Sequence, residues 1–198
     1  MWFFNALARI LKMIEDKLFE RIDFTETPFI IDEYENCRFV GCNLFQANLS
    51  NVVFRECSFE ECDVSMANLN NTTLNDVKFK GCKLVGLQFE NCKTFLFSVS
   101  FENCILKLAV FYQTKLKKTL FRNCNLQEVD FTEADLTEAI LDNCDLMRAT
   151  FNYTILEKAD LRTSYLYSID PVINRLKKAR FSRQHIDGLL DRFDINIE

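Results

Sequence analysis

The sequence predicts an all-β solenoid in which the chain winds into square coils of twenty residues. Three observations predict this fold. A large apolar residue recurs at every fifth position, side chains twenty positions apart are alike, and only 4 Gly and 2 Pro occur among 198 residues. A period of five fits neither the 3.6-residue turn of an α-helix nor the two-residue alternation of a long strand. It fits a chain that turns a corner after every five residues.

The five-residue period runs in two blocks. The first begins at Phe39 and ends at Phe89, and the second begins at Leu96 and ends at Leu166. Two positions before each apolar centre stands a mostly small residue, and both are expected to point inward because residues two apart share one side of a strand. The step of seven from Phe89 to Leu96 indicates a two-residue insertion near residues 91–93.

Stacking of the coils is predicted by the residues twenty apart, once the insertion is counted. Neighbouring coils are expected to pair through parallel backbone hydrogen bonds at a spacing of about 4.8 Å. Three of the resulting columns are Cys42, Cys62, Cys82, Cys104, Cys124, Cys144; then Phe39, Phe59, Phe79, Phe101, Phe121; and then Phe54, Leu74, Leu96, Leu116, Leu136, Leu156.

Helical segments are predicted at both ends of the solenoid, which itself spans residues 22–168. Apolar residues at steps of three and four predict an amphipathic helix over residues 1–20. Met13 is an alternative start, which would make residues 1–12 an extension. Residues 169–198 are expected to form a helical cap with a short helix over 172–178. Its apolar residues either cover the last coil or form a dimer contact; they are Ile186, Leu189, Leu190, Phe193 and Ile195.

The nine cysteines are interpreted as core residues. Eight of them occupy the small inward position, where Ala, Val and Thr also occur, and a free cysteine packs there as a small apolar side chain. Zinc ligands and disulfides are the alternatives, but zinc needs four converging ligands and stacked cysteines would hold their Cβ vectors parallel. Cys92 lies at the expected insertion and is predicted to be the most exposed.

One coil carries a concentration of acidic residues. Residues 126–146 contain no Lys or Arg, and all their acids occupy outward positions. The formal net charge of the whole chain is only -5, so this acidic band is the feature most able to attract a basic partner. The alternative is a solvated surface that keeps the rod soluble. The acids are Glu128, Asp130, Glu133, Asp135, Glu138, Asp142 and Asp145.

The repeated units resemble those of the pentapeptide-repeat family. They include Cys-Asn-Leu at 42–44, Ala-Asn-Leu at 47–49 and 67–69, and Ala-Asp-Leu at 134–136 and 159–161. The resemblance covers residues 37–168 closely and 22–36 loosely, and it implies a right-handed quadrilateral β-helix. Within that family the chain resembles the quinolone-resistance group of Qnr and MfpA, whose members protect DNA gyrase and topoisomerase IV and dimerise through C-terminal elements.

That resemblance implies a non-enzymatic protein-interaction module that acts on type II topoisomerases as a homodimer. Long insertions, which some Qnr proteins carry as projecting loops, are absent from this sequence. The alternative function is a structural scaffold for an unrelated protein. Direct binding of nucleic acid is not expected.

Other classes of function find no support in the sequence. A catalytic pair of a nucleophile and a histidine would have to use the only histidine, His185, and no phosphate-binding loop or cofactor motif occurs. No stretch approaches the roughly 18 apolar residues of a membrane span, and residues 1–12 lack a basic region before the apolar residues and a cleavage site. The sequence therefore predicts a cytoplasmic protein without catalytic activity, cofactor or metal.

Overall fold

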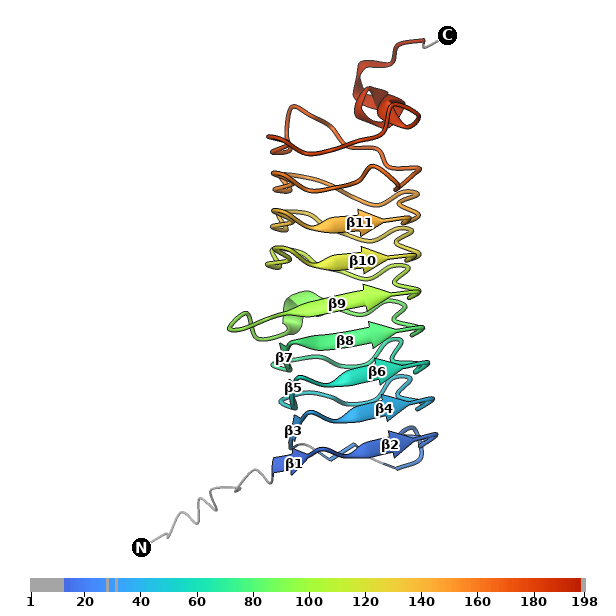
Figure 1. Cartoon of the computed structure of the whole chain (residues 1–198), viewed down its shortest axis with the longest axis vertical. Coiled ribbons are helices and arrows are strands. Elements are labelled where there is room, and N and C mark those ends of the chain that lie inside the picture. The colour runs from blue at the N-terminus through green and yellow to red at the C-terminus, as the bar shows by residue number, and fades with distance from the viewer. Residues whose placement is uncertain (1–12, 28, 31, 197–198) are drawn as a thin grey trace, which may run out of the picture.

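The computed structural model describes residues 13–196 except residues 28 and 31. It is a four-walled β-solenoid that rises from the strands β1 and β2 at one end to a short helical segment at the other (Figure 1). The strands on the near wall all run in one direction as the chain climbs, and the coils wind in a right-handed sense. The predicted fold class is therefore confirmed.

Two walls contain regular strands, and every pairing is parallel with the register of twenty or, across the insertion, twenty-two residues. One wall has four strands: β1 (Met13–Glu15), β3 (Glu33–Glu35), β5 (Val53–Arg55) and β7 (Thr73–Asn75). The other has seven: β2 (Leu18–Glu20), β4 (Arg38–Val40), β6 (Ser58–Glu60), β8 (Val77–Lys80), β9 (Val99–Glu102), β10 (Leu120–Arg122) and β11 (Ile140–Asp142).

The remaining backbone pairs through single bridges, such as those that join Asn43 to Asp63 and Val110 to Asp130. We name each wall after one of its central inward residues. In chain order they are the Leu116 wall, which begins with β1; the Phe121 wall, which contains β2 to β11; the Leu126 wall; and the Phe111 wall. The central residues of the Phe111 wall are Leu49, Leu69, Phe89, Phe111, Phe131 and Phe151.

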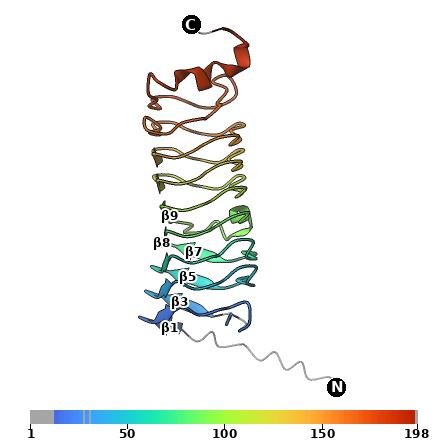
Figure 2. The same cartoon turned by 90° about the vertical axis from the view of Figure 1, so that its right-hand side faces the viewer.

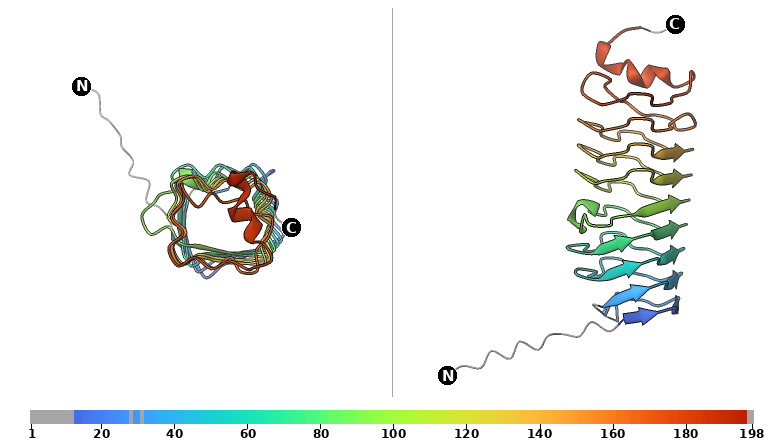
Figure 3. Two further views of the ribbon diagram at one scale, coloured as in Figure 1. Left: turned by 90° about the horizontal axis from the view of Figure 1, so that it is seen from above. Right: turned by 60° about the vertical axis from the view of Figure 1, so that its left-hand side comes forward.

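Side chains fill the inside of the square tube that is seen from above in Figure 3. Phenylalanine rings stack along the column: the ring centroids of Phe101 and Phe121 are 5.0 Å apart with an interplanar angle of 15°. Rings from the opposite wall meet them edge-on across the core, as Phe131 of the Phe111 wall meets Phe121 at 6.0 Å and 84°. The predicted inward columns therefore form one continuous apolar core.

Residues 13–20 are strands, not the second half of a helix, so the prediction for this segment is wrong. Ile14 and Phe19 are five positions apart and already follow the repeat, and they lie opposite Tyr34 and Phe39 in the parallel ladders. Pairing with the next coil outweighs the weak helical periodicity. Residues 1–12, the other part of that prediction, lie outside the described residues.

Residues 172–178 also continue the solenoid where a short helix was expected. Arg175 bridges to Ile155 and Arg180 bridges to Asp160. The Asn174 side chain donates a hydrogen bond of 2.8 Å to the Phe151 carbonyl one coil below. Only then does the chain form two 3₁₀ helices, η2 (Ile186–Leu189) and η3 (Asp191–Phe193), which lie at the end opposite β1 (Figure 2).

The insertion lies in residues 94–98, slightly later than expected. The Lys93 amide still bonds to the Thr72 carbonyl at 2.9 Å, and the Ser98 amide then bonds to the Leu74 carbonyl. The segment follows the short 3₁₀ helix η1 (Phe89–Asn91), and both project beside β8 and β9 in Figure 1. Leu96, expected in the core, is 57% exposed, and Phe97 packs inward instead with its ring edge-on to Phe89.

Candidate functional site

The inside of the solenoid holds unreactive thiols. All nine cysteines are unpaired and buried. This includes Cys92, which the sequence predicted to be the most exposed. At 6% its exposed fraction is the largest of the nine, but it stays buried because regular pairing with the coil below holds until Lys93. Burial raises the pKa of Cys92 to about 12. Within the described residues, no cluster of three or more His, Cys, Asp or Glu side chains could hold a metal ion.

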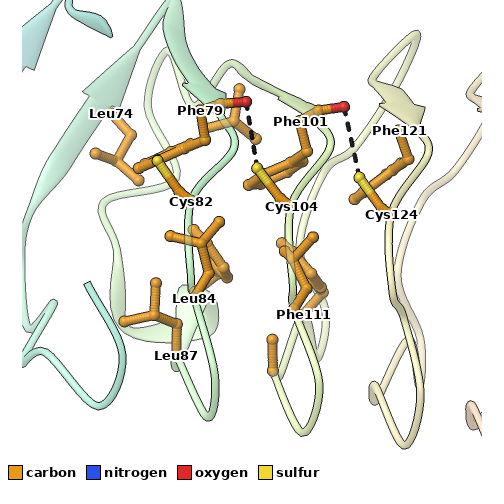
Figure 4. Close-up of a cluster of buried hydrophobic side chains, with 14 of the residues drawn as sticks. Leu74, Phe79, Cys82, Leu84, Leu87, Phe101, Cys104, Phe111, Phe121 and Cys124 are labelled. Carbon is orange, nitrogen blue, oxygen red and sulfur yellow. Dashed lines mark hydrogen bonds between the residues drawn. The ribbon is translucent and has the colours of Figure 1, made fainter. Parts of the chain in front are cut away.

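The cysteines also make hydrogen bonds that link successive coils. The thiol of Cys104 donates to the Phe79 carbonyl at 3.4 Å, and that of Cys124 donates to the Phe101 carbonyl at 3.6 Å (Figure 4). At three positions where threonine or serine replaces the cysteine, the hydroxyl does the same: Thr72 and Thr154 donate to the carbonyls of Leu49 and Phe131 at 2.8 Å, and Ser164 donates to the Leu141 carbonyl at 2.7 Å. These side chains therefore join neighbouring coils as well as filling space.

The acidic band encircles the molecule instead of forming one flat patch. Its seven residues are distributed over all four walls, and four of them form ion pairs with bases of adjacent coils. The pairs are Glu128 with Lys107, Asp135 with Lys117, Glu138 with both Lys118 and Lys158, and Asp142 with Arg122. The ammonium groups of Lys158 and Lys118 lower the pKa of Glu138. These four acids therefore present little net charge to a partner.

The sequence interpretation missed this pairing because it followed the chain and not the stack. Ion-pair partners are about one coil apart, so the base-free run at 126–146 lies between coils that carry bases. The signal was available: Lys118 and Lys158 each stand twenty positions from Glu138.

The other three acids of the band have only neutral partners in the part of the chain that the structure describes. The Asp145 carboxylate accepts a hydrogen bond from the Gln127 side-chain amide at 2.7 Å. The Asp130 carboxylate accepts one from the Thr132 backbone amide. Glu133 accepts from the Gln113 amide at 2.8 Å and from the Tyr112 hydroxyl at 3.4 Å. These carboxylates keep their negative charge toward solvent.

Two of these acids, Asp130 and Glu133, lie on the Phe111 wall, which has no basic residue among its outward positions from 48 to 153. The lower coils present asparagines there, and the upper ones present acids and tyrosines. Tyr153, directly above Glu133, is 65% exposed. This wall combines unpaired negative charge with exposed aromatic surface, and it is the best candidate docking surface for a basic partner.

The predicted dimer residues do not share one face. Leu189 packs against the core, and the buried Gly188 accepts a hydrogen bond from the Ile169 amide at 2.8 Å. The C-terminal segment crosses the open end of the last coil (Figure 3). Leu190 is partly exposed, whereas Ile186, Phe193 and Ile195 are 45%, 50% and 55% exposed. The segment thus both covers the coil and presents apolar side chains to solvent.

Comparison with known families agrees with this architecture. A model described as "Pentapeptide repeat region" matches residues 33–95 and 94–189. The chain belongs to the pentapeptide-repeat family. None of the curated protein sequences compared with this pentapeptide-repeat protein matches it.

The solved structure of full-length QnrB1 shares its fold. Full-length QnrB1, described as a plasmid-mediated fluoroquinolone resistance protein, aligns with a TM-score of 0.56 at 18% identity, covering 93% of this chain and 100% of QnrB1. HetL, a protein involved in heterocyst differentiation regulation from the cyanobacterium Nostoc sp. strain PCC 7120, has a TM-score of 0.43 at 17% identity, covering 86% of each chain. Over residues 13–196 with their two gaps, no helix of this pentapeptide-repeat protein is both long and apolar enough to cross a bilayer.

Proposed function

We propose that this pentapeptide-repeat protein is a non-enzymatic, cytoplasmic interaction module that binds a type II topoisomerase, as a homodimer. The observation that carries the proposal is the unpaired acidic surface of the Phe111 wall, on a chain of which 93% aligns with QnrB1. Filled inward faces leave the outer walls as the surface available for function. A scaffold for an unrelated protein is the alternative.

Docking is assigned to the Phe111 wall because its charge is not neutralised within the molecule. Asp130 and Glu133 accept only from neutral groups, so a basic protein surface would supply their first charged partners. Electrostatic attraction acts over about 8–10 Å at physiological salt. The wall would therefore speed encounter with a basic surface, while Tyr112 and Tyr153 supply apolar contact area.

The test is binding to DNA gyrase and its supercoiling activity, with and without a fluoroquinolone. We expect the unmodified protein to bind gyrase at low salt and to alter drug inhibition. The variant Asp130→Lys/Glu133→Lys should bind less. The control Glu102→Lys/Asp142→Lys makes the same charge change on the Phe121 wall and should bind as the unmodified protein does.

Two outcomes contradict the proposal at different levels. If the unmodified protein neither binds gyrase nor changes supercoiling at low salt, the topoisomerase proposal fails and the scaffold alternative replaces it. If both double variants lose binding equally, the partner is correct but the Phe111 wall is not the docking surface.

The homodimer is assigned to the exposed part of the C-terminal segment. Ile186, Phe193 and Ile195 project from a segment that Gly188 and Leu189 anchor to the last coil. Apolar side chains held on an anchored segment lose little conformational freedom on association, which favours a dimer. The dimer contact is tested by the last prediction of the Discussion.

A further inference from the structure

A cavity lies beside the insertion. Residues 94–98 leave the wall between two coils, and a cavity of about 220 Å³ lies between this segment, η1 and the coil above. Three aromatic side chains line it: Phe89 from η1, Phe97 from the insertion itself, and Tyr112 from the next coil. Phe89 is buried, while Tyr112 is 39% exposed and marks the outer side. The cavity can thus be reached from solvent on the Phe111 wall.

A carboxylate in this cavity has an unused hydrogen-bonding atom. Glu90, in η1, lines the cavity, and its Oε2 is buried with no hydrogen-bond partner among the described residues. Burial raises the pKa of Glu90, and the nearby negative charge of Asp130 adds to the effect. A buried carboxylate oxygen without a donor is costly, so a cation that entered the cavity would relieve both the missing hydrogen bond and the repulsion.

The walls favour an organic cation over a metal ion. The faces of aromatic rings attract ammonium groups and also contact their alkyl carbons, whereas Mg²⁺ and Ca²⁺ require several oxygen ligands. Lys115 lines the same cavity and forms no ion pair in the described part of the chain. Its positive charge repels a cation that enters the cavity. The site can therefore be tested by one substitution that should weaken cation binding, at Glu90, and one that should strengthen it, at Lys115.

We propose that this cavity binds an alkylammonium group, with its N–H groups donating to Glu90 and its carbons against Phe89, Phe97 and Tyr112. Two sources share this chemistry: a free small amine, and the side chain of a lysine on another protein. The site stands independently of the topoisomerase proposal, because neither Asp130 nor Glu133 lines the cavity and any protein with an accessible lysine could supply the group.

The test uses n-butylammonium chloride as the free amine, with sodium chloride at the same ionic strength as the reference. Isothermal titration calorimetry measures binding, and the shift in Tm measures it independently, because a ligand of the native state raises Tm. We expect saturable millimolar binding to the unmodified protein and none by the neutral analogue n-butanol. A capped Gly-Lys-Gly peptide separates the sources: binding by both shows that a chain-borne lysine fits, and binding by butylammonium alone shows a small-molecule site.

Three variants make the result specific. Glu90→Gln keeps the shape and removes the charge, so it should lower the affinity at least tenfold without lowering Tm. Lys115→Met removes the competing charge and should raise the affinity severalfold. Glu102→Gln makes the same change on the Phe121 wall, opposite the Phe111 wall, and should bind as the unmodified protein does. The proposal is overturned if butylammonium does not bind, if n-butanol binds equally, or if Glu90→Gln binds as tightly as the unmodified protein. Loss of gyrase binding alone would leave this result unchanged.

Discussion

At the scale of single residues, the backbone amide of the small inward residue finds a different hydrogen-bond acceptor at different corners. At an alanine corner the backbone closes a turn, as when the Ala47 amide donates to the Leu44 carbonyl at 3.0 Å. At two cysteine corners the amide instead has a side-chain acceptor in the coil above: Cys62 Sγ for the Cys42 amide at 3.4 Å, and Ser164 Oγ for the Cys144 amide at 3.3 Å. The sequence predicted that these cysteines are buried. It could not show their hydrogen bonds, because the corner geometry that requires them is set by the stacked coils.

The first prediction concerns Cys62. Its thiol accepts a hydrogen bond from the Cys42 backbone amide and donates one to the Phe39 carbonyl at 3.3 Å. Cys62→Ala removes both bonds and should lower the free energy of unfolding by about 1–3 kcal/mol. Cys62→Ser keeps a donor and an acceptor, as the natural Ser164 does in the same column, and should cost less. Urea denaturation measures both. Equal or greater stability of the alanine variant would show that the thiol acts only as a small apolar side chain.

At the scale of elements, the columns of the walls were predictable and the ends were not. Each column is repeated many times, so a single register accounts for all of Phe39 to Phe121. The ends and the insertion occur once. Five- and four-residue spacings compete at Ile14 and Leu18, and two extra residues near Phe89 can be placed on either side of Cys92. Backbone pairing with the adjacent coil determines both the conformation of residues 13–20 and the position of the insertion. No local sequence pattern predicts that pairing.

The second prediction concerns the ring column. Phe121 is fully buried, stacks on Phe101 and meets Phe111 and Phe131 edge-on. Phe121→Ala should cost about 3–5 kcal/mol because the cavity it leaves cannot close between fixed coils. Hydrogen exchange should show the loss of protection concentrated in the adjacent coils. Tyr153→Ala, at an exposed aromatic, is the control and should change stability by less than about 0.5 kcal/mol. Unchanged stability of Phe121→Ala would contradict the column.

The third prediction concerns the attachment of the C-terminal segment. A Cβ at Gly188 would lie 2.0 Å from the Tyr167 carbonyl oxygen, closer than any real contact. Gly188→Ala should therefore separate η2 and η3 from the last coil and make Arg183 and Arg192 susceptible to trypsin. The body of the solenoid should stay folded, since each coil contacts mainly its neighbours. Asp187→Ala, next to it and exposed, should leave cleavage unchanged. Equal resistance of Gly188→Ala would show that the segment is held elsewhere.

At the scale of the whole molecule, stacking converts a linear sequence into four surfaces of different character. The acidic run at 126–146 was visible in the sequence, but its division into paired and unpaired acids follows from residues one coil away. Lys107 and Arg122, for example, neutralise Glu128 and Asp142, whereas the Phe111 wall receives no base from either neighbouring coil. A partner that approaches from the side meets a column of residues about twenty apart. Docking surfaces in such a solenoid are therefore better sought along columns than along the chain.

The last prediction concerns assembly. Light scattering at micromolar concentration should give twice the mass of one chain, and Phe193→Asp should give a monomer, because it places a charge in the apolar contact without touching Gly188 or Leu189, which hold the segment in place. Phe95→Asp makes the same change at a side chain that is 77% exposed on the insertion, at a distance from the C-terminal segment along the solenoid, and should remain dimeric. A monomeric unmodified protein would refute the dimer. Dissociation by both substitutions would move the contact to the insertion, since only a shared interface accounts for sensitivity at Phe95.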